Sequence, residues 1–513
     1  MSKRVRNMLL SVVALIAIGA VVAVLLTTPA PDTTDGEDTT TTTTGTTVAP
    51  DIVIVDKTKN AQGGAVENPV VRVDIDNQKD RFAVIRRDDS TLAVEAYQDL
   101  MPDTTGLTSL CDTLAYFTAI STTTADEADS AYGLDKPLAR ITTEYHDGAK
   151  VTLSIGAQSK GTQGYYCRRD GDDTLYIIDT TVAESFFDNG MQLIGKSLIA
   201  PPSVNEDDNE GQAQLLNLWL TGACRDKAIE IVTDTDAAYP GLTYVSSYVL
   251  KSPHLRAVDS DYFTTITPSM TYLQASGVAA VHPTVEQLDE FGLSDPYSVA
   301  AFTLAIVSTT AADNGGTKTS HYNDREHMIL LGNKNENGEY YALVNQHDIV
   351  YTLSPSSVPW AEMQAIDVTS KLLFMKAITA VDSVTVTADG KKQTFALEHR
   401  PNEETRDKQM VVTSGGKTYS TPEFRILYQL MIGIKRVADA TGESATGEAV
   451  MTLEMTFNDG TSPMTITLYP LTASRYLCVT ADGEQAAVSI QTVDDFLKQY
   501  RNYLNGDPVT STY

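Results

Sequence analysis

The feature that most constrains the fold of this chain is an internal repeat. The stretch AYGLDKPLARITTEYHDGAKVTLSIG at 131–156 has the pattern of a Gly/Pro turn, a strand, an Asp-Gly turn and a second strand. Another hairpin and the start of a capped helix follow at 164–187. The same order returns at 290–363, and a more divergent copy runs over 449–500. A recurring order of this kind indicates one supersecondary unit that is used several times.

The front half of each unit repeats less clearly. Strand pairs are expected at 70–87, 228–247 and 383–399, and each is followed by a helix with apolar periodicity. Strands and helices that do not alternate as βαβ units favour antiparallel sheets. The predicted fold class is therefore α+β, with three repeated units of antiparallel β-hairpins and short helices. The predicted ranges are 51–200 for unit 1, 201–223 for an exposed linker, 224–371 for unit 2 and 372–513 for the divergent unit 3.

The N-terminal segment predicts a membrane anchor. Residues 8–26 contain no charged side chain, and a helix of this length nearly crosses a hydrocarbon core of about 30 Å. The preceding basic tail, 1–7, favours a cytoplasmic N-terminus by the positive-inside rule. The Thr-rich stretch 27–50 contains too few apolar residues to pack and is expected to be a disordered tether. A cleaved signal peptide is the alternative, but its apolar region would be unusually long.

The anchor would make this a single-pass protein of the bacterial cell membrane, with its bulk outside the cytoplasm. The formal net charge of −29 opposes binding to the phosphates of nucleic acids, so no nucleic-acid partner is expected. Four cysteines in an exported chain could form disulfides, but their number is small for this length. Buried free thiols are an equally good interpretation for Cys111, Cys167, Cys224 and Cys478.

The stretch GMQLIGKS at 190–197 matches the P-loop pattern of nucleotide hydrolases. A P-loop requires a preceding strand, a loop of small residues and a following helix. Here the residues before Gly190 resemble the end of a helix, and four bulky residues occupy the loop. We therefore predict a structural connector and no nucleotide.

Other short motifs point to turns and packing rather than to chemistry. NKNENG at 333–338 and SGGK at 414–417 are expected to be hairpin turns. The spacing of His321 and His327 is weak evidence for metal. Tyr165 and Tyr340 could stack on sugars, but their equivalent positions favour sheet packing. No catalytic, cofactor-binding or metal-binding residue is predicted, and no cofactor is expected.

The segments YGLDKP, GYYCRRDGDDTLYIID and FGLSDP, together with EYYALVNQHDIVYTLS, resemble the bacterial domain-of-unknown-function 4340 family. The resemblance is good over about 70–375 and weak elsewhere. It implies an N-terminal membrane helix, an extracytoplasmic bulk and a partnership with gliding-type ABC exporters. It implies no catalytic residues.

Together these observations predict a non-enzymatic, membrane-anchored accessory subunit of an ABC-type export or cell-envelope complex. Its expected partners are the membrane, through residues 8–26, and an ABC transporter permease. Two alternatives stay open. The first is a cell-surface adhesin or glycan-binding protein, and the second is an envelope hydrolase with a carboxylate pair that the sequence does not single out.

Overall fold

The computed structural model describes residues 52–511, apart from 161–162, 205–210, 235–237, 240–241, 243–245, 312–316 and 346–347. The predicted tail, membrane helix and tether, at 1–7, 8–26 and 27–50, lie outside these residues. Within the described ranges, no helix is both long and apolar enough to cross a membrane.

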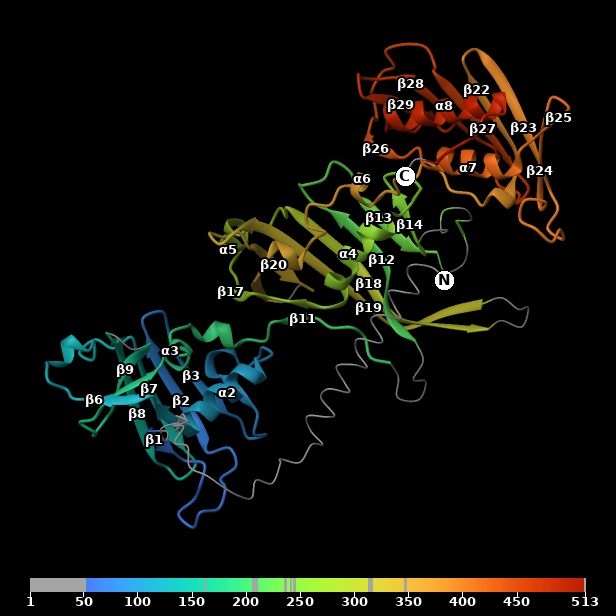
Figure 1. Cartoon of the computed structure of the whole chain (residues 1–513). Coiled ribbons are helices and arrows are strands. Elements are labelled where there is room, and N and C mark those ends of the chain that lie inside the picture. The colour runs from blue at the N-terminus through green and yellow to red at the C-terminus, as the bar shows by residue number, and fades with distance from the viewer. Residues whose placement is uncertain are drawn as a thin grey trace, which may run out of the picture. The chain divides into compact units, whose positions relative to one another are not determined.

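The predicted α+β class is confirmed, because the chain is mostly antiparallel β-sheet with few helices (Figure 1). Three large sheets hold most of the strands. Two small two-stranded sheets, β1 with β5 and β11 with β16, accompany them.

The first sheet has eight strands in the order β4-β3-β2-β7-β8-β9-β10-β6. Helix α2 (Thr104–Ala115) packs on one of its faces, with Leu107 and Leu114 fully buried. The strands here and alongside are β1 Ile52–Asp56, β2 Val70–Asn77, β3 Arg81–Arg86, β4 Leu92–Val94, β5 Tyr116–Ala119, β6 Ser121–Thr123, β7 Ala139–Tyr145, β8 Lys150–Gln158, β9 Gly164–Arg169 and β10 Leu175–Asp179. The short helices are η1 Glu95–Tyr97, η2 Asp129–Ala131, α3 Thr180–Glu184 and η3 Gly190–Leu193.

The second sheet has nine strands in the order β15-β14-β13-β12-β18-β19-β20-β21-β17. Helix α4 (Ser260–Thr271) packs on it through Phe263, Ile266 and Met270. The strands here and alongside are β11 Ser197–Ile199, β12 Gln212–Thr221, β13 Ile229–Thr233, β14 Tyr248–Ser252, β15 Arg256–Ala257, β16 Leu273–Gln274, β17 Gly277–Val281, β18 Ser298–Ala311, β19 Thr317–Lys334, β20 Tyr340–Val344 and β21 Ile349–Leu353. The short helices are α5 Val285–Glu290, η4 Pro355–Ser357 and α6 Ala365–Val368.

The third sheet has nine strands in the order β25-β24-β23-β22-β27-β28-β29-β30-β26. Two helices, α7 (Thr421–Ile432) and α8 (Ile490–Asn505), lie together on one face of it (Figure 1). The other elements are η5 Ile378–Ala380, β22 Val381–Ala388, β23 Lys391–His399, β24 Met410–Ser414, β25 Lys417–Tyr419, β26 Arg436–Asp439, β27 Met451–Phe457, β28 Met464–Pro470, β29 Arg475–Thr480 and β30 Gln485–Ser489.

The three large sheets share one strand order. In each, a first meander runs from the centre to one edge and is followed by a helix. The chain then forms the strand at the opposite edge, and a second meander runs from the centre toward that strand. The central pairs are therefore β2 with β7, β12 with β18 and β22 with β27.

The prediction of a linker over 201–223 is wrong for its second half. Residues 212–221 form β12, which lies at the centre of the second sheet. Leu215, Leu218 and Leu220 point to the buried side, while Asn217 and Trp219 between them are exposed. The acidic run before this strand favoured a linker, whereas the period-two pattern of the strand itself is the stronger signal. The strand pair of this unit is consequently β12 with β13 rather than the predicted 228–247.

The recurring Tyr/Phe-Gly-Leu turns make the same close contact in the first and second sheets. Gly133 and Gly292 have φ angles of +68° and +70°, which favour glycine. The carbonyl before each glycine accepts a 2.8 Å hydrogen bond, from the Ala157 N–H in one case and the Asn333 N–H in the other. The turn thereby lies against a glycine of the strand: a Cβ on Gly156 would lie 2.2 Å from the Tyr132 carbonyl oxygen.

Candidate functional site

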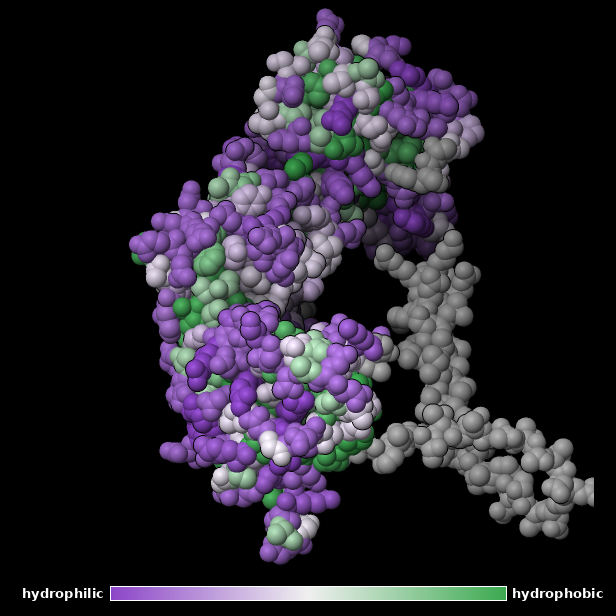
Figure 2. Space-filling view, turned by 90° about the vertical axis from the view of Figure 1, so that its left-hand side faces the viewer, coloured by the Kyte–Doolittle hydropathy of each residue, from purple (hydrophilic) through white to green (hydrophobic). Residues whose placement is uncertain are grey.

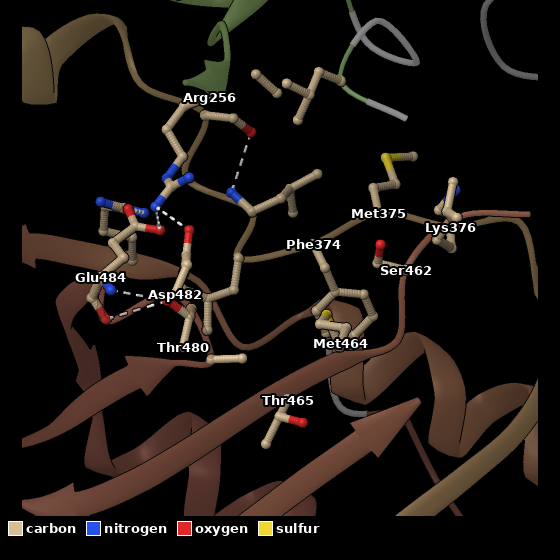
Figure 3. Close-up of a pocket in the computed structure, with 18 of the residues that line it drawn as sticks. Arg256, Phe374, Met375, Lys376, Ser462, Met464, Thr465, Thr480, Asp482 and Glu484 are labelled. Carbon is tan, nitrogen blue, oxygen red and sulfur yellow. Dashed lines mark hydrogen bonds and ion pairs between the residues drawn. The ribbon is translucent and has the colours of Figure 1, made fainter. Parts of the chain in front are cut away.

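A cleft of about 360 Å³ lies where residues of the second and third sheets meet (Figure 3). Arg256 in β15 contributes one wall, and Asp482 and Glu484 in the β29–β30 turn contribute another. The segment 371–377, which connects α6 to η5, forms a third wall. Clefts between structural units are common places for ligands to bind, which makes this one the candidate site.

The charged end of the cleft is a hub formed by Arg256, Arg436 and Glu484. The Glu484 carboxylate forms ion pairs with both guanidinium groups. The side chains of Glu484 and Arg436 are only 14% and 9% exposed. An uncompensated charge at such depth would be costly, so each member depends on the others. The hub also borders a second cavity of about 300 Å³.

Asp482 adds a second carboxylate at the edge of the hub. Its Oδ2 lies 3.4 Å from Nη2 of Arg256. A hydrogen bond from the Thr480 hydroxyl, helped by the charge of Arg256, lowers the pKa of the Asp482 carboxyl. The hub therefore holds two cations against two carboxylates, and its charges are balanced without a ligand.

Lys376 lies in the connecting segment, and Figure 3 shows it near Ser462. Its ammonium group lies 2.8 Å from Oδ2 of Asp459 and over the ring of Phe457. The hydrogen bond from Lys376 holds the pKa of Asp459 well below its usual range. A lysine that activates a serine must have its amino group free to accept the serine proton, whereas Asp459 and Phe457 both engage the amino group of Lys376. The geometry therefore does not favour a Ser–Lys nucleophile here.

The cleft also has an apolar wall. Phe374 is 9% exposed and belongs to the core of the third sheet, while Met375 is 38% exposed. Met464, at the start of β28, is partly buried beside them. Methionine side chains are flexible and adapt to irregular partners. The cleft thus combines an adaptable apolar wall with a charged end whose groups are paired with one another.

The P-loop-like stretch is a connector, as predicted. Residues 190–193 form η3, and a strand, β11, follows instead of a helix. The N–H of Gly190 donates to Oδ2 of Asp80 at 2.9 Å, and the Gln192 amide donates to the Val278 carbonyl. The backbone and side chains of this segment therefore join the first sheet to β17 of the second.

The tyrosines at equivalent positions pack against the sheets, as predicted. Tyr340 is 2% exposed, and the ring of Tyr165 lies edge-on against Phe187. Each hydroxyl donates to a carboxylate further along the chain, that of Tyr165 to Glu184 and that of Tyr340 to Glu362. In the third sheet, the Tyr476 hydroxyl donates to Asp494 in the same way. The carboxylate partners lie about 20 residues after each tyrosine and form no short motif with it.

The remaining motifs also have structural partners. His321 contacts Asp324, whereas His327 contacts Asn345 and the ring of Phe302, so the two histidines do not share a site. Among the described residues, no group of three His, Cys, Asp or Glu side chains could hold a metal ion. The stretches 333–338 and 414–417 include hairpin turns, between β19 and β20 and between β24 and β25.

The cysteines do not form disulfides, so free thiols are the correct interpretation. Cys111, Cys167 and Cys478 are buried, and Cys224 is partly buried. The equivalent positions Cys167, Ala342 and Cys478 are all buried, each in the second-to-last strand of a meander.

The hub has no signature in the sequence. Its members, Arg256, Arg436 and Glu484, are separated by up to 228 positions in the sequence and belong to no short motif. Each looks like an ordinary surface charge in its own segment. Only the folded chain brings the three together.

The comparison with protein families shows to which family this chain belongs. A family described as a domain of unknown function (DUF4340) matches residues 94–210 and 249–428, which together are more than half of the chain. The chain belongs to this family. The two matched segments contain both copies of the close glycine contact, at Gly156 and Gly332. No curated protein matches the chain. No solved structure matches it either.

Proposed function

We propose that this DUF4340 protein is a non-enzymatic, membrane-anchored extracytoplasmic protein that serves as an accessory subunit of an ABC-type export or cell-envelope complex. The observation that carries this proposal is the cleft of Figure 3. Its charged groups are paired with one another, and its accessible wall is apolar and includes the exposed Met375. Such a wall suits a side chain of a protein partner.

The sequence supports the location. Residues 8–26 are apolar and long enough for a single span, the basic tail 1–7 favours a cytoplasmic end, and the tether 27–50 would hold the sheets away from the lipid. The shared strand order of the three sheets supports an extracytoplasmic part built from one repeated unit behind this anchor. The face seen in Figure 2 is mostly hydrophilic, with hydrophobic side chains in separate patches, as suits an exposed surface.

A nucleotide, a nucleic acid or a cofactor is not part of the proposal. The 190–197 stretch lacks the strand–loop–helix geometry that phosphate binding requires. The negative charge of the chain opposes a nucleic-acid partner. Of the two tyrosines that could serve the alternative glycan-binding protein, Tyr340 is buried and cannot stack on a sugar, whereas Tyr165 is half-buried.

The proposal can be tested by affinity purification of the tagged full-length chain from detergent-solubilised membranes. We expect an ABC-type permease to copurify with the wild-type chain. Met375→Glu should abolish this recovery, because it places a charge on the apolar wall. Met101→Glu is the matched control, since Met101 is 77% exposed and lies outside the cleft. A wild-type chain that is recovered alone would count strongly against the proposal.

A further inference from the structure

Trp219 is an exposed tryptophan on the face of the second sheet that points away from α4. It lies in β12 between Leu218 and Leu220, which are fully buried on the helix side. The Trp219 side chain is 43% exposed, whereas the other tryptophan of the chain, Trp360, is fully buried. The indole therefore presents a large accessible aromatic surface on this face of the sheet.

The fold itself does not require tryptophan at this position. Trp219 pairs with Ala301 across the central strand pair of the second sheet. The equivalent position in the first sheet follows from the turn glycines. Thr142 follows Gly133 at the same sequence spacing as Ala301 follows Gly292, and Thr142 pairs with Asp74. Asp74 forms an ion pair with Arg72 on a polar sheet face. The same strand position thus accepts a small acidic residue, and the indole of Trp219 is a departure particular to this sheet.

A hollow of about 530 Å³ lies beside the indole. Its floor is built from two rows of side chains that cross β12, β18 and β19. One row is Trp219, Ala301 and Met328, and the other is Asn217, Thr303 and Glu326. The rows are about 7 Å apart, because alternate residues of a strand share a face. Ala301 is small, so it leaves the edge of the indole accessible.

The second row carries hydrogen-bonding groups. The Asn217 amide and the Thr303 hydroxyl lie 3.1 Å apart and bond to each other. Glu326 is exposed and pairs with Thr303 across the strands. Among the described residues that line the hollow, Glu326 carries the only formal charge at pH 7, because burial lowers the pKa of His327.

We infer that this hollow binds an uncharged saccharide, with one sugar ring stacked on the indole of Trp219 and its hydroxyl groups bonded to Asn217, Thr303 and Glu326. The apolar face of a sugar ring packs on an aromatic ring, and its hydroxyls require amide, hydroxyl and carboxylate partners. One ring spans the distance between the two rows. This inference does not depend on the proposed export partner.

The composition of the hollow favours a saccharide over other ligands. A phosphate or an anionic lipid would meet the carboxylate of Glu326 and no cation among the lining residues. A peptide would gain most from several apolar pockets or an arginine, whereas one exposed aromatic ring stands here beside polar groups.

Tryptophan fluorescence provides a direct test, because Trp360 is shielded and Trp219 is not. The full-length chain, purified in a detergent without sugar groups, would be titrated with chitotetraose, cellotetraose, maltotetraose and mannotetraose. We expect at least one to shift the emission saturably below about 10 mM. Calorimetry with that saccharide should show a loss of at least about tenfold in affinity for Trp219→Ala and a smaller loss for Trp219→Phe.

Two further variants separate a specific site from general effects. Asn217→Ala should weaken binding severalfold without changing the fold, since Asn217 is exposed. Tyr272→Ala is the matched control, because Tyr272 is 55% exposed but lies outside the hollow, and it should bind as the wild type does. The inference would be overturned by either of two results: none of the four tetrasaccharides shifts the emission, or Trp219→Ala binds as tightly as the wild type.

Discussion

Glu484 is the residue on which the charge balance of the cleft depends. It pairs with both Arg256 and Arg436, and the latter is 9% exposed. Glu484→Gln keeps the shape of the side chain but leaves two guanidinium groups without their shared carboxylate. Removing one partner of a buried ion pair usually costs about 3 kcal/mol or more. We expect a loss of that size in the stability of the third sheet, measured by calorimetry.

The matched control for this variant is Glu454→Gln. Glu454 pairs with Lys392 at 2.8 Å, but the two side chains are 40% and 62% exposed. An exposed pair contributes roughly 0–1 kcal/mol, so the control should unfold almost like the wild type. Equal effects of the two substitutions would show that the hub is an ordinary surface pair.

The cysteines allow a second prediction at the residue scale. Burial raises the pKa of the thiols of Cys167 and Cys478 to about 12 and that of Cys111 to about 11. At pH 8 the reactive thiolate of these three groups is therefore scarce, while an unfolded thiol ionises near pH 8.5. We expect iodoacetamide to label Cys224 first in the native chain, as read by peptide mass spectrometry. Early labelling of Cys167 would contradict the burial.

The raised pKa values of the thiols also predict that the folded chain becomes less stable as the pH rises above the pKa of an unfolded thiol. Their folded pKa values lie above the unfolded value, so the unfolded chain loses its thiol protons first as the pH rises. The contribution of these groups to stability is therefore complete below about pH 8 and decreases above about pH 8.5.

At the scale of elements, the contact between the Phe-Gly-Leu turn and β19 can be tested at Gly332. A Cβ at this position would lie 2.1 Å from the carbonyl oxygen of Phe291, which is backbone and cannot easily move. We expect Gly332→Ala to destabilise the second sheet by about 3 kcal/mol or more, since overpacking against backbone forces a shift of the strand. Both tryptophans belong to strands or the core of this sheet, so fluorescence during urea unfolding reports its stability.

The control for Gly332 is Gly338→Ala in the β19–β20 turn. Gly338 has a φ of +79°, but nothing lies within 4 Å of the position of its Cβ. The expected cost is only the left-handed conformation of an alanine, about 1 kcal/mol. A larger effect at Gly338 than at Gly332 would mean that conformation, and not the close contact, explains the glycines of this motif.

Much of the element structure could be predicted because it is encoded locally. Alternating apolar residues, Asp-Gly and Asn-Gly turns and recurrent segments indicated antiparallel hairpins with few helices, which the structure has. The strand β12 was missed because the acidic residues before it suggested a linker. Asn217 and Trp219 then fell inside that supposed linker, so the face they form could not be recognised.

The candidate site could not be predicted, for a different reason. The hub joins side chains from β15, β26 and the turn before β30, and nothing in the sequence pairs these segments. The pairing depends on how units of the chain meet, and repeats reveal the unit but not its contacts with a neighbour.

At the scale of the whole molecule, the decisive property is on which side of a membrane the sheets lie. Residues 8–26 and the charges around them are the basis of this prediction. Lys3, Arg4 and Arg6 precede the apolar run, and moving three positive charges outward against an inside-negative potential of roughly 100 mV costs about 7 kcal/mol, at about 2.3 kcal/mol per charge. This cost favours a cytoplasmic N-terminus and an extracytoplasmic remainder.

Protease treatment of intact, wall-stripped cells would check this orientation. We expect antibodies against the third sheet to lose their full-length signal when protease is added outside, because the tether 27–50 would be accessible there. A cytoplasmic marker protein must stay intact in the same sample to show that the membrane is closed. Full protection of the third sheet would place it in the cytoplasm, and it would then exclude both the anchored orientation and an extracytoplasmic role for the cleft.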